Sequence, residues 1–163
     1  MMFIRTAGEA DLAAIRDLLT TTWHATYDAI YGPEGAAEIT REWHAMPALR
    51  ARLGRPRSEF VVADDGRRLG GAAFAAAAAA PQVVTLFLLY VAPDLQARGI
   101  GGELLAEIEA SFPEAKTLRL EVERQNAAAI RFFEKHGFAS TPEEDGEPRD
   151  GAISITVLEK ALR

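Results

Sequence analysis

The sequence predicts a single-domain α/β fold of the α+β kind, in which helices flank a central mixed, mostly antiparallel sheet. Residues 83–91 and 117–123 are strand-like, and a segment with helical spacing follows each of them. Residues 59–63 and 69–79 flank an Asp-Asp-Gly turn signal, which implies antiparallel pairing. The chain has 163 residues, 48% hydrophobic and 26% charged, so one domain with a sizeable core accounts for it.

The N-terminal part is predicted to hold one short strand and two helices. Residues 3–5 are expected to form the strand. Residues 9–22 are expected to form a helix, because leucine and isoleucine recur there on one helical face. Residues 38–53 are expected to form a second helix, which Pro47 can interrupt because proline lacks the N–H that a helix interior uses.

The alanine-rich segment gives two conflicting signals. Residues 75–80 are an unbroken run of alanine, the strongest helix former, so propensity alone predicts a helix. A glycine pair before the run, Pro81 after it and the preceding turn signal favour a strand over residues 69–79. We predict the strand. Its small side chains leave room beside the sheet, which bulky neighbours or a ligand can occupy.

The C-terminal half is predicted to alternate strands and helices. Residues 103–108 have helical spacing, and a second helix is expected to begin after Asn126, a good N-cap residue, and to end at Gly137. Residues 142–151 are polar and finish on an Asp-Gly turn signal. The segments expected to be strands are residues 83–91, 117–123, 138–140 and 152–157.

Composition and charge exclude several classes of function. The net charge of −6 argues against nucleic acid as the main partner and is compatible with an amine ligand. The chain has no cysteine, which excludes an acyl-cysteine intermediate, disulfides and a cysteine-ligated metal. Its three histidines lack metal-ligand spacing, so we expect no metal. Without a signal-peptide pattern or a membrane-spanning stretch, we expect a cytoplasmic protein with no membrane partner.

Residues 96–102 read QARGIGG and lie between a predicted strand and a predicted helix. Glycine allows a ligand to approach closely, and the N–H groups and dipole of a helix start suit phosphate oxygens, as does Arg98. A P-loop is excluded because Gly-Lys-Ser/Thr is absent, and a Rossmann fingerprint is weak because Leu104 replaces its third glycine. A Gln/Arg-x-x-Gly-x-Gly/Ala motif and an ordinary glycine-containing turn remain as interpretations.

A second segment decides between these two interpretations. Residues 126–138 read NAAAIRFFEKHGF and follow the strand at residues 117–123. Together with the motif at residues 96–101, this segment resembles the GCN5-related N-acetyltransferase (GNAT) family, which has the pattern Asn-x-x-Ala-x-x-Phe-Tyr-Glu-Lys-x-Gly-Phe. The resemblance is specific over residues 83–138 and looser elsewhere. It departs from the family at Phe133, where tyrosine is usual.

The resemblance implies the acyl-CoA N-acyltransferase fold and acetyl-CoA as cosubstrate. In the family, the pantetheine arm lies between two splayed strands, which here end at Val91 and Val122, and the pyrophosphate binds backbone amides of the glycine-rich loop. Backbone groups of the first strand bond the arm and polarise the acetyl oxygen. The residues implied to bind the cosubstrate are Leu89, Val91, Gln96, Ala97, Arg98, Gly99, Ile100, Gly101, Gly102, Asn126 and Phe133.

The catalytic candidates are Glu121 and Tyr90. Glu121 lies in a Leu-Glu-Val sequence that resembles the strand of family members acting on protein N-termini, where this glutamate can act as base; alternatively it is a solvated or salt-bridged side chain. Phe133 has no proton for the leaving thiolate, so Tyr90 is the candidate acid, with strand packing of Tyr90 and protonation by water as alternatives. Glu123 shares the face of Glu121, and His24 can titrate near neutrality.

The expected acceptor is a small-molecule primary amine that attacks acetyl-CoA directly. Residues 23–31, placed after the first helix, interleave aromatic side chains with His24 and Asp28 and could hold an amine. Alternatively, Trp23 and Tyr27 form an apolar helical stripe. A protein N-terminal α-amine is the second choice of acceptor, and a non-catalytic acyl-CoA-binding module is the third hypothesis. Acyl-chain preference and oligomeric state stay open, a homodimer included.

Overall fold

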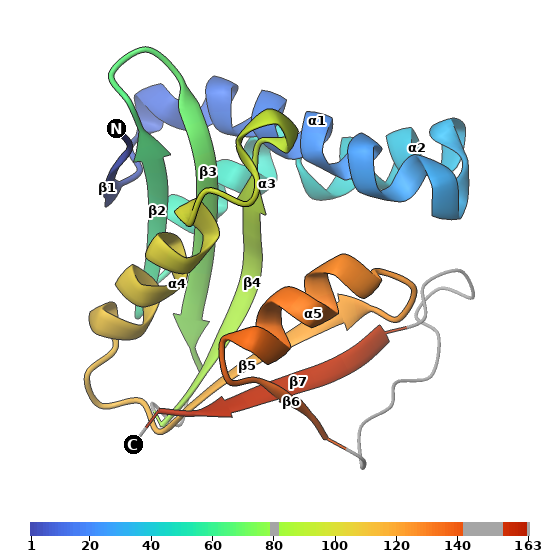
Figure 1. Cartoon of the computed structure of the whole chain (residues 1–163). Coiled ribbons are helices and arrows are strands. Elements are labelled where there is room, and N and C mark those ends of the chain that lie inside the picture. Colours follow the sequence, from blue (N-terminus) through green and yellow to red (C-terminus); the bar gives the residue numbers. More distant parts are fainter. Residues whose placement is uncertain (79–81, 142–154, 163) are drawn as a thin grey trace.

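The computed structural model describes residues 1–78, 82–141 and 155–162 (Figure 1). Within these residues one sheet has the strand order β1-β2-β3-β4-β5-β7-β6. All neighbouring strands are antiparallel except β4 and β5, which are parallel. This is the fold class that the sequence predicts. The strands are β1 (Phe3–Thr6), β2 (Ser58–Asp64), β3 (Leu69–Ala77), β4 (Val83–Val91), β5 (Thr117–Glu123), β6 (Ala139–Ser140) and β7 (Ile155–Ala161). The α-helices are α1 (Leu12–Tyr31), α2 (Pro33–Trp43), α3 (Met46–Leu53), α4 (Ile100–Ser111) and α5 (Ala127–Lys135).

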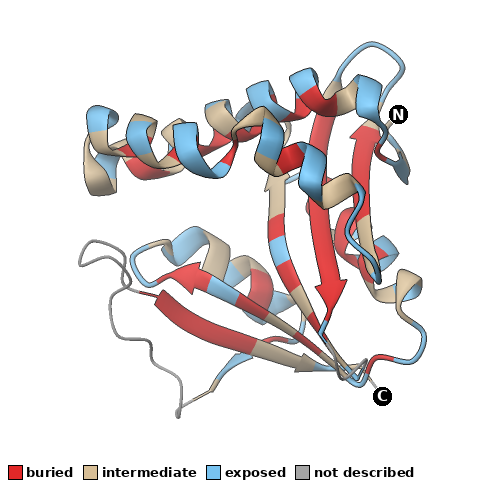
Figure 2. Cartoon of the chain, turned by 180° about the vertical axis from the view of Figure 1, so that it is seen from behind, coloured by how far each residue is buried: buried red, intermediate tan, exposed pale blue. Residues whose placement is uncertain are grey.

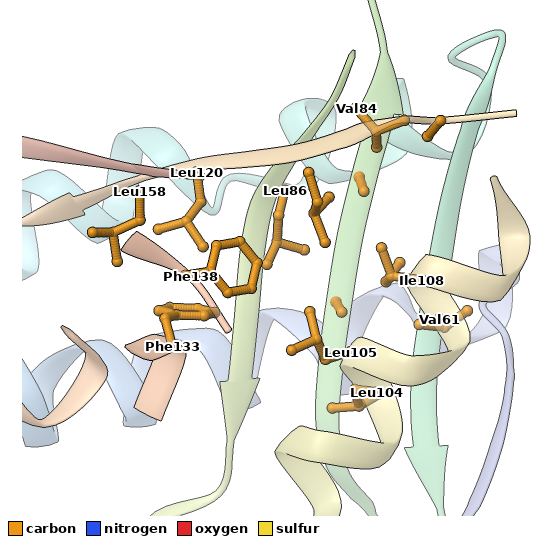
Figure 3. Close-up of a cluster of buried hydrophobic side chains, with 14 of the residues drawn as sticks. Val61, Val84, Leu86, Leu104, Leu105, Ile108, Leu120, Phe133, Phe138 and Leu158 are labelled. Carbon is orange, nitrogen blue, oxygen red and sulfur yellow. The ribbon is translucent and has the colours of Figure 1, made fainter. Parts of the chain in front are cut away.

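Apolar side chains fill both faces of the sheet. On one face, α4 and α5 cover a core cluster in which Leu104, Leu105 and Phe133 meet strand residues such as Leu86 and Leu120 (Figure 3). On the other face, α1 and α3 cover a second cluster. Burial on both sides explains why β2 and β3 are buried along most of their length (Figure 2).

The alanine-rich segment forms the predicted strand over its described part, and β3 ends at Ala77. Alanine side chains alternate between the two core clusters, and all of those from Ala72 to Ala77 are buried. The small residues let helix α4 approach the sheet: a Cβ at Gly71 would lie 2.8 Å from Cδ1 of Leu104. Packing therefore accounts for the small side chains, and tertiary context outweighs helix propensity here. Residues 79 and 80 lie outside the described part.

Two predictions about the N-terminal helices are corrected. Helix α1 begins after a short 3₁₀ turn and runs to Tyr31, nine residues beyond the predicted end, because its apolar stripe continues through Trp23 and Tyr27 until Gly32 adopts a φ of 79°. The predicted second helix is two helices, and Pro47 occupies the first turn of α3, where its missing N–H costs nothing.

The C-terminal elements follow the prediction closely. Asn126 caps α5 by accepting a hydrogen bond from the Ala129 amide at 3.2 Å, and Gly137, with a φ of 97°, follows the last turn. Strand β7 begins at Ile155 in the described part and extends past the predicted end to Ala161. The turn predicted at residues 150–151 lies outside the described residues.

Candidate active site

Strands β4 and β5 pair at only one end, and the candidate site lies where they diverge. Their parallel register stops at Leu86 opposite Leu120. At this point the register of β4 with β3 also shifts, so that Phe87 forms a bulge. Beyond the bulge the two strands separate (Figure 1), and in the described part of the chain no strand pairs with the β5-facing edge of residues 88–91. An extended ligand with amide groups could pair with this edge as an added strand.

The glycine-rich loop connects the diverging end of β4 to α4. The Gln96 side-chain amide donates to the Val91 carbonyl at 3.2 Å, which fixes the start of the loop. Ala97 and Gly99 adopt positive φ angles of 64° and 86°. The first helical hydrogen bond of α4 runs from the Glu103 amide to the Gly99 carbonyl at 3.0 Å, so the preceding amides have no acceptor within the helix.

The side chains of this loop divide between core and surface. Ile100, the first residue of α4, buries its side chain in the core, so only its backbone is available to a ligand. Gly101 is buried against α5, because a Cβ there would lie 3.1 Å from the Phe132 ring, and a Cβ at Gly102 would lie 3.1 Å from Nε2 of His136. Arg98 is exposed. The loop thus offers a helix N-terminus and an exposed arginine, a combination suited to phosphate.

A cavity of about 500 Å³ occupies the divergence of β4 and β5. Helices α1, α2 and α3 bound one side of it, and β5 and α5 bound the other. Alternation along β4 sends Leu89 and Val91 toward the α4 face, where both are partly buried, and Tyr90 toward α1. The backbone edge of β4 and the Tyr90 side chain therefore reach the same space.

Tyr90 lies in an apolar and aromatic environment. Its ring meets that of His44 edge-on, with ring centroids 6.2 Å apart. Burial raises the pKa of the Tyr90 hydroxyl above its ordinary value, which keeps the group neutral and able to donate a hydrogen bond. Burial also lowers the pKa of His44 to about 4, so this imidazole is neutral near pH 7.

The acidic residues of β5 line the cavity from the opposite side. Glu121 is exposed at the cavity edge, whereas Glu123 is buried. The carboxylate of Glu123 accepts a hydrogen bond from the Tyr31 hydroxyl and a second, 3.3 Å long, from the Gln125 amide. Burial and this contact raise the pKa of Tyr31. The sequence predicts that Glu123 shares a strand face with Glu121, but it does not indicate Tyr31 as the partner of Glu123.

Asn126 lies at the start of α5, just after β5, and Phe133 lies on α5. Besides capping α5, Asn126 donates through Nδ2 to the Tyr27 hydroxyl at 3.2 Å. Phe133 is 7% exposed, packs against Phe138 with ring centroids 5.3 Å apart, and contributes to the cavity wall. The position that is tyrosine in the family pattern is therefore an apolar part of this wall.

The aromatic segment at residues 23–31 is not a loop, as its placement after the first helix had implied, but the second half of α1. Trp23 and Tyr27 are buried with ring centroids 4.1 Å apart, so the helical-stripe interpretation is correct. The same stripe still faces the cavity, which Trp23, Tyr27 and Tyr31 all line. His24 instead pairs with Asp28 at 2.6 Å, and neither residue lines the cavity.

Sequence reasoning did not single out Arg52, which lies on α3 and lines the cavity. Its guanidinium carbon is 5.8 Å from the centre of the Phe74 ring, and its Nη1 is buried with no hydrogen-bond partner among the described residues. Nothing local distinguishes it from the other arginines of this segment, because only the packing of α3 brings it to the cavity.

Neither a metal-binding cluster nor a membrane-spanning helix occurs among the described residues. In residues 1–78, 82–141 and 155–162, histidine, aspartate and glutamate do not gather in any group of three that could hold a metal ion. Within the same ranges, every helix is too short or too polar to cross a membrane.

Comparisons with known proteins show which family and fold the chain resembles. A family model described as the acetyltransferase (GNAT) family matches residues 12–138. The chain is 34% identical over 109 residues to the ribosomal protein bS18-alanine N-acetyltransferase of Escherichia coli K12, which covers 63% of this chain and 72% of that protein. It is 27% identical over 139 residues to the spermidine N(1)-acetyltransferase of Thermoplasma acidophilum, covering 83% and 86% of the two chains.

A solved structure extends the similarity to the whole chain. The PaiA N-acetyltransferase of Thermoplasma acidophilum, in complex with coenzyme A, superposes with a TM-score of 0.85 and 26% identity over 99% of each chain.

Proposed function

Because the chain belongs to the GNAT family of acetyltransferases, we propose that it transfers the acetyl group of acetyl-CoA to the primary amine of a small molecule by direct attack. The observation that carries this proposal is the cavity at the divergence of β4 and β5, which brings an unpaired strand edge, a tyrosine and two carboxylates together.

Three features support acetyl-CoA as the cosubstrate. The amides at the start of α4 and the exposed Arg98 are suited to its pyrophosphate. The β4 edge from Leu89 to Val91 can pair with the amides of the pantetheine arm and polarise the acetyl oxygen. A similar protein has been solved with coenzyme A. Asn126 and Phe133 would border the arm from α5.

The chain's own residues can supply the proton transfers. The amine nitrogen attacks the thioester carbonyl carbon, the new C–N bond forms, and the C–S bond breaks. Glu121 takes the proton that the amine loses, directly or through water. Tyr90 donates a hydrogen bond or a proton to the leaving thiolate, and its raised pKa keeps the hydroxyl protonated and favours the hydrogen bond over full proton transfer.

The surroundings of the cavity support a small acceptor. Aromatic side chains of α1 and the carboxylates of β5 enclose the space, and both attract an ammonium group before it is deprotonated. A second candidate is the α-amine of a protein, which the Leu-Glu-Val sequence of β5 and the similarity to the bS18-alanine N-acetyltransferase favour.

Turnover against a panel of amines tests the proposal. Acetyl-CoA would be incubated with amino acids, polyamines and short peptides, and the release of the coenzyme A thiol would be measured together with product mass. We expect acetylation of at least one small amine and weaker acetylation of peptides. Thiol release that is independent of any amine, with no acetylated product, would contradict the proposal.

A further inference from the structure

The two ends of the cavity carry opposite chemistry. At the β5 end, Glu121 and Glu123 present carboxylates, and Arg119, which also lines the cavity there, is paired with Glu159 at 3.7 Å. At the α3 end, Arg52 lies close enough to His44 and Tyr90 to act on the titration of both. A cavity that only had to hold an amine would require the acidic end alone, so the cationic end needs its own explanation.

Arg52 lacks an anionic partner in the described part of the chain. Of the residues that the structure describes, none gives Nη1 of Arg52 a hydrogen bond, and none of their carboxylates acts on the Arg52 pKa, which burial lowers. Its guanidinium instead lies over the face of the Phe74 ring, 5.8 Å from the ring centre. An arginine donor that is buried and unpaired costs free energy that a bound anion would recover.

A second unpaired donor lies in the same wall. The indole Nε1 of Trp23 is also buried without a hydrogen-bond partner among the described residues. The centres of the Trp23 and His44 rings are 5.6 Å apart, and Arg52 is close to His44. Tyr90 adds a neutral hydroxyl at this end. The α1–α3 end of the cavity is therefore rich in donors, whereas the β5 end is rich in acceptors.

We propose that the acceptor carries a carboxylate as well as its primary amine, as an α-amino acid does, and that Arg52 binds this carboxylate while the amine lies toward Glu121. This inference rests on the proposed function and names its substrate class. The planar fork of arginine matches the two oxygens of a carboxylate, and the apolar surroundings strengthen the pair.

The arrangement also disfavours the other acceptors. A polyamine that placed one amine near Glu121 would bring a second cation toward Arg52, where like charges repel. The N-terminal residue of a peptide carries an amide in place of the α-carboxylate, so it would leave Arg52 unpaired. An amino acid and its carboxamide therefore form a matched pair that differs only in the group that Arg52 is expected to bind.

The experiment compares kcat/KM for each of the common L-amino acids with kcat/KM for its carboxamide, with acetyl-CoA at saturation. We expect at least one acid to exceed its amide by about tenfold or more. In Arg52→Gln this preference should fall by about 10- to 100-fold, mainly through the KM of the acid, while the amide is little affected. Arg52→Lys keeps the charge without the fork and should be intermediate.

Arg50→Gln is the matched control. Arg50 lies on α3 with Arg52, pairs with Glu9 at 2.8 Å on the surface, and does not line the cavity. The same loss of charge at this position should leave the acid-to-amide ratio unchanged. Thermal unfolding and acetyl-CoA affinity of each variant show whether the fold and the cosubstrate site are intact.

The outcomes separate this inference from the proposed function. Equal turnover of acids and amides, a preference for amides, acetylation of polyamines alone, or an acid preference that survives Arg52→Gln would overturn the inference and leave the acetyltransferase proposal standing. Equal loss of acid and amide turnover in both Arg52 variants would assign Arg52 to the acetyl group and also overturn it. Failure of the wild-type protein to bind acetyl-CoA would overturn the proposed function itself.

Discussion

The two walls of the cavity differ in whether backbone or side chains form them. The wall that we assign to acetyl-CoA consists mainly of backbone, namely the β4 edge beyond its bulge and the start of α4. The opposite wall consists of side chains from α1, α3 and β5, held by contacts such as Tyr31–Glu123 and Tyr27–Asn126, which join residues 92 and 99 positions apart. The first wall follows from local sequence, whereas the second exists only after the chain has folded. Acceptor choice can therefore change through single side chains while the cosubstrate wall is kept.

The largest expected effect is loss of the base. Glu121→Gln should lower kcat by roughly 10²- to 10⁴-fold with little change in acetyl-CoA affinity, because it removes a proton acceptor without changing the backbone wall. Glu123→Gln is the matched comparison and should cost less, since Glu123 already bonds Tyr31 and Gln125. Steady-state rates from about pH 6 to about pH 9 check this. Unchanged turnover of Glu121→Gln across this range would exclude it as base.

The acceptor wall should be sensitive to acid through His44. Its pKa of about 4 lies below the ordinary 6.5 because the ring is buried, so the unfolded chain binds a proton that the folded chain does not. The free energy of unfolding is therefore expected to fall by about 3 kcal/mol as the pH drops from 6.5 toward 4. His44→Gln should flatten this part of the profile. Denaturant unfolding at several pH values measures it, and an equally steep profile in the variant would refute the assignment.

The cosubstrate wall should be sensitive to charge at the start of α4. Acetyl-CoA at ~100 times its dissociation constant should stabilise the wild type by about 2.7 kcal/mol. Gly101→Asp should abolish this stabilisation, because a negative charge enters the phosphate site. Gly101→Ala meets the same Phe132 ring at 3.1 Å without the charge and separates strain from electrostatics.

Thermal shifts of the two Gly101 variants with acetyl-CoA distinguish the effect of strain from the effect of charge. A normal shift in folded Gly101→Asp would place the pyrophosphate elsewhere. A second check is Arg98→Glu, compared with Arg16→Glu on the exposed side of α1, which changes the net charge equally but should leave acetyl-CoA binding intact.

A smaller effect is expected from Tyr31. Tyr31→Phe leaves the buried Glu123 carboxylate without its hydroxyl donor and should cost about 1–3 kcal/mol of stability, together with a higher acceptor KM. Tyr27→Phe, which removes the bond to Asn126, should behave similarly but more mildly. Acceptor kinetics and acetyl-CoA affinity would be measured on the same proteins. Loss of acetyl-CoA affinity alone would show that these tyrosines belong to the other wall.

The smallest effect is expected from Phe133→Tyr. The substitution adds one hydroxyl to a side chain that is 7% exposed, and Tyr90 already offers a donor in the cavity. We expect kcat to stay within a few-fold, while Tyr90→Phe is harmful. A large gain in Phe133→Tyr would mean that thiolate protonation limits the rate and that Tyr90 does not supply the proton.

The sequence predicted most of the fold because its signals were local. Alternation defined β5, the Asn126 cap and Gly137 delimited α5, and the turn at residues 64–66 indicated the β2–β3 hairpin. The same signals located the glycine-rich loop. The end predicted for α1 is wrong because an aromatic stripe is compatible with a helix face or with a loop until its packing partners are known.

The acceptor wall could not be predicted in the same way. Arg52 sits among several arginines with the same local pattern, and only the packing of α3 on the sheet distinguishes it. Likewise, nothing near Glu123 in the sequence indicates that Tyr31 will reach it. Contacts between residues so far apart in the sequence form only in the completed fold, so the sequence alone does not indicate them.

The central claim is that acetyl-CoA lies between the diverging ends of β4 and β5, and amide hydrogen exchange with and without acetyl-CoA tests it most directly. We expect protection of residues 88–91 and 97–102 together, because the β4 edge and the α4 amides would both gain acceptors or donors from one ligand. Protection confined to other segments, or a bound ligand that protects neither of these two, would contradict it.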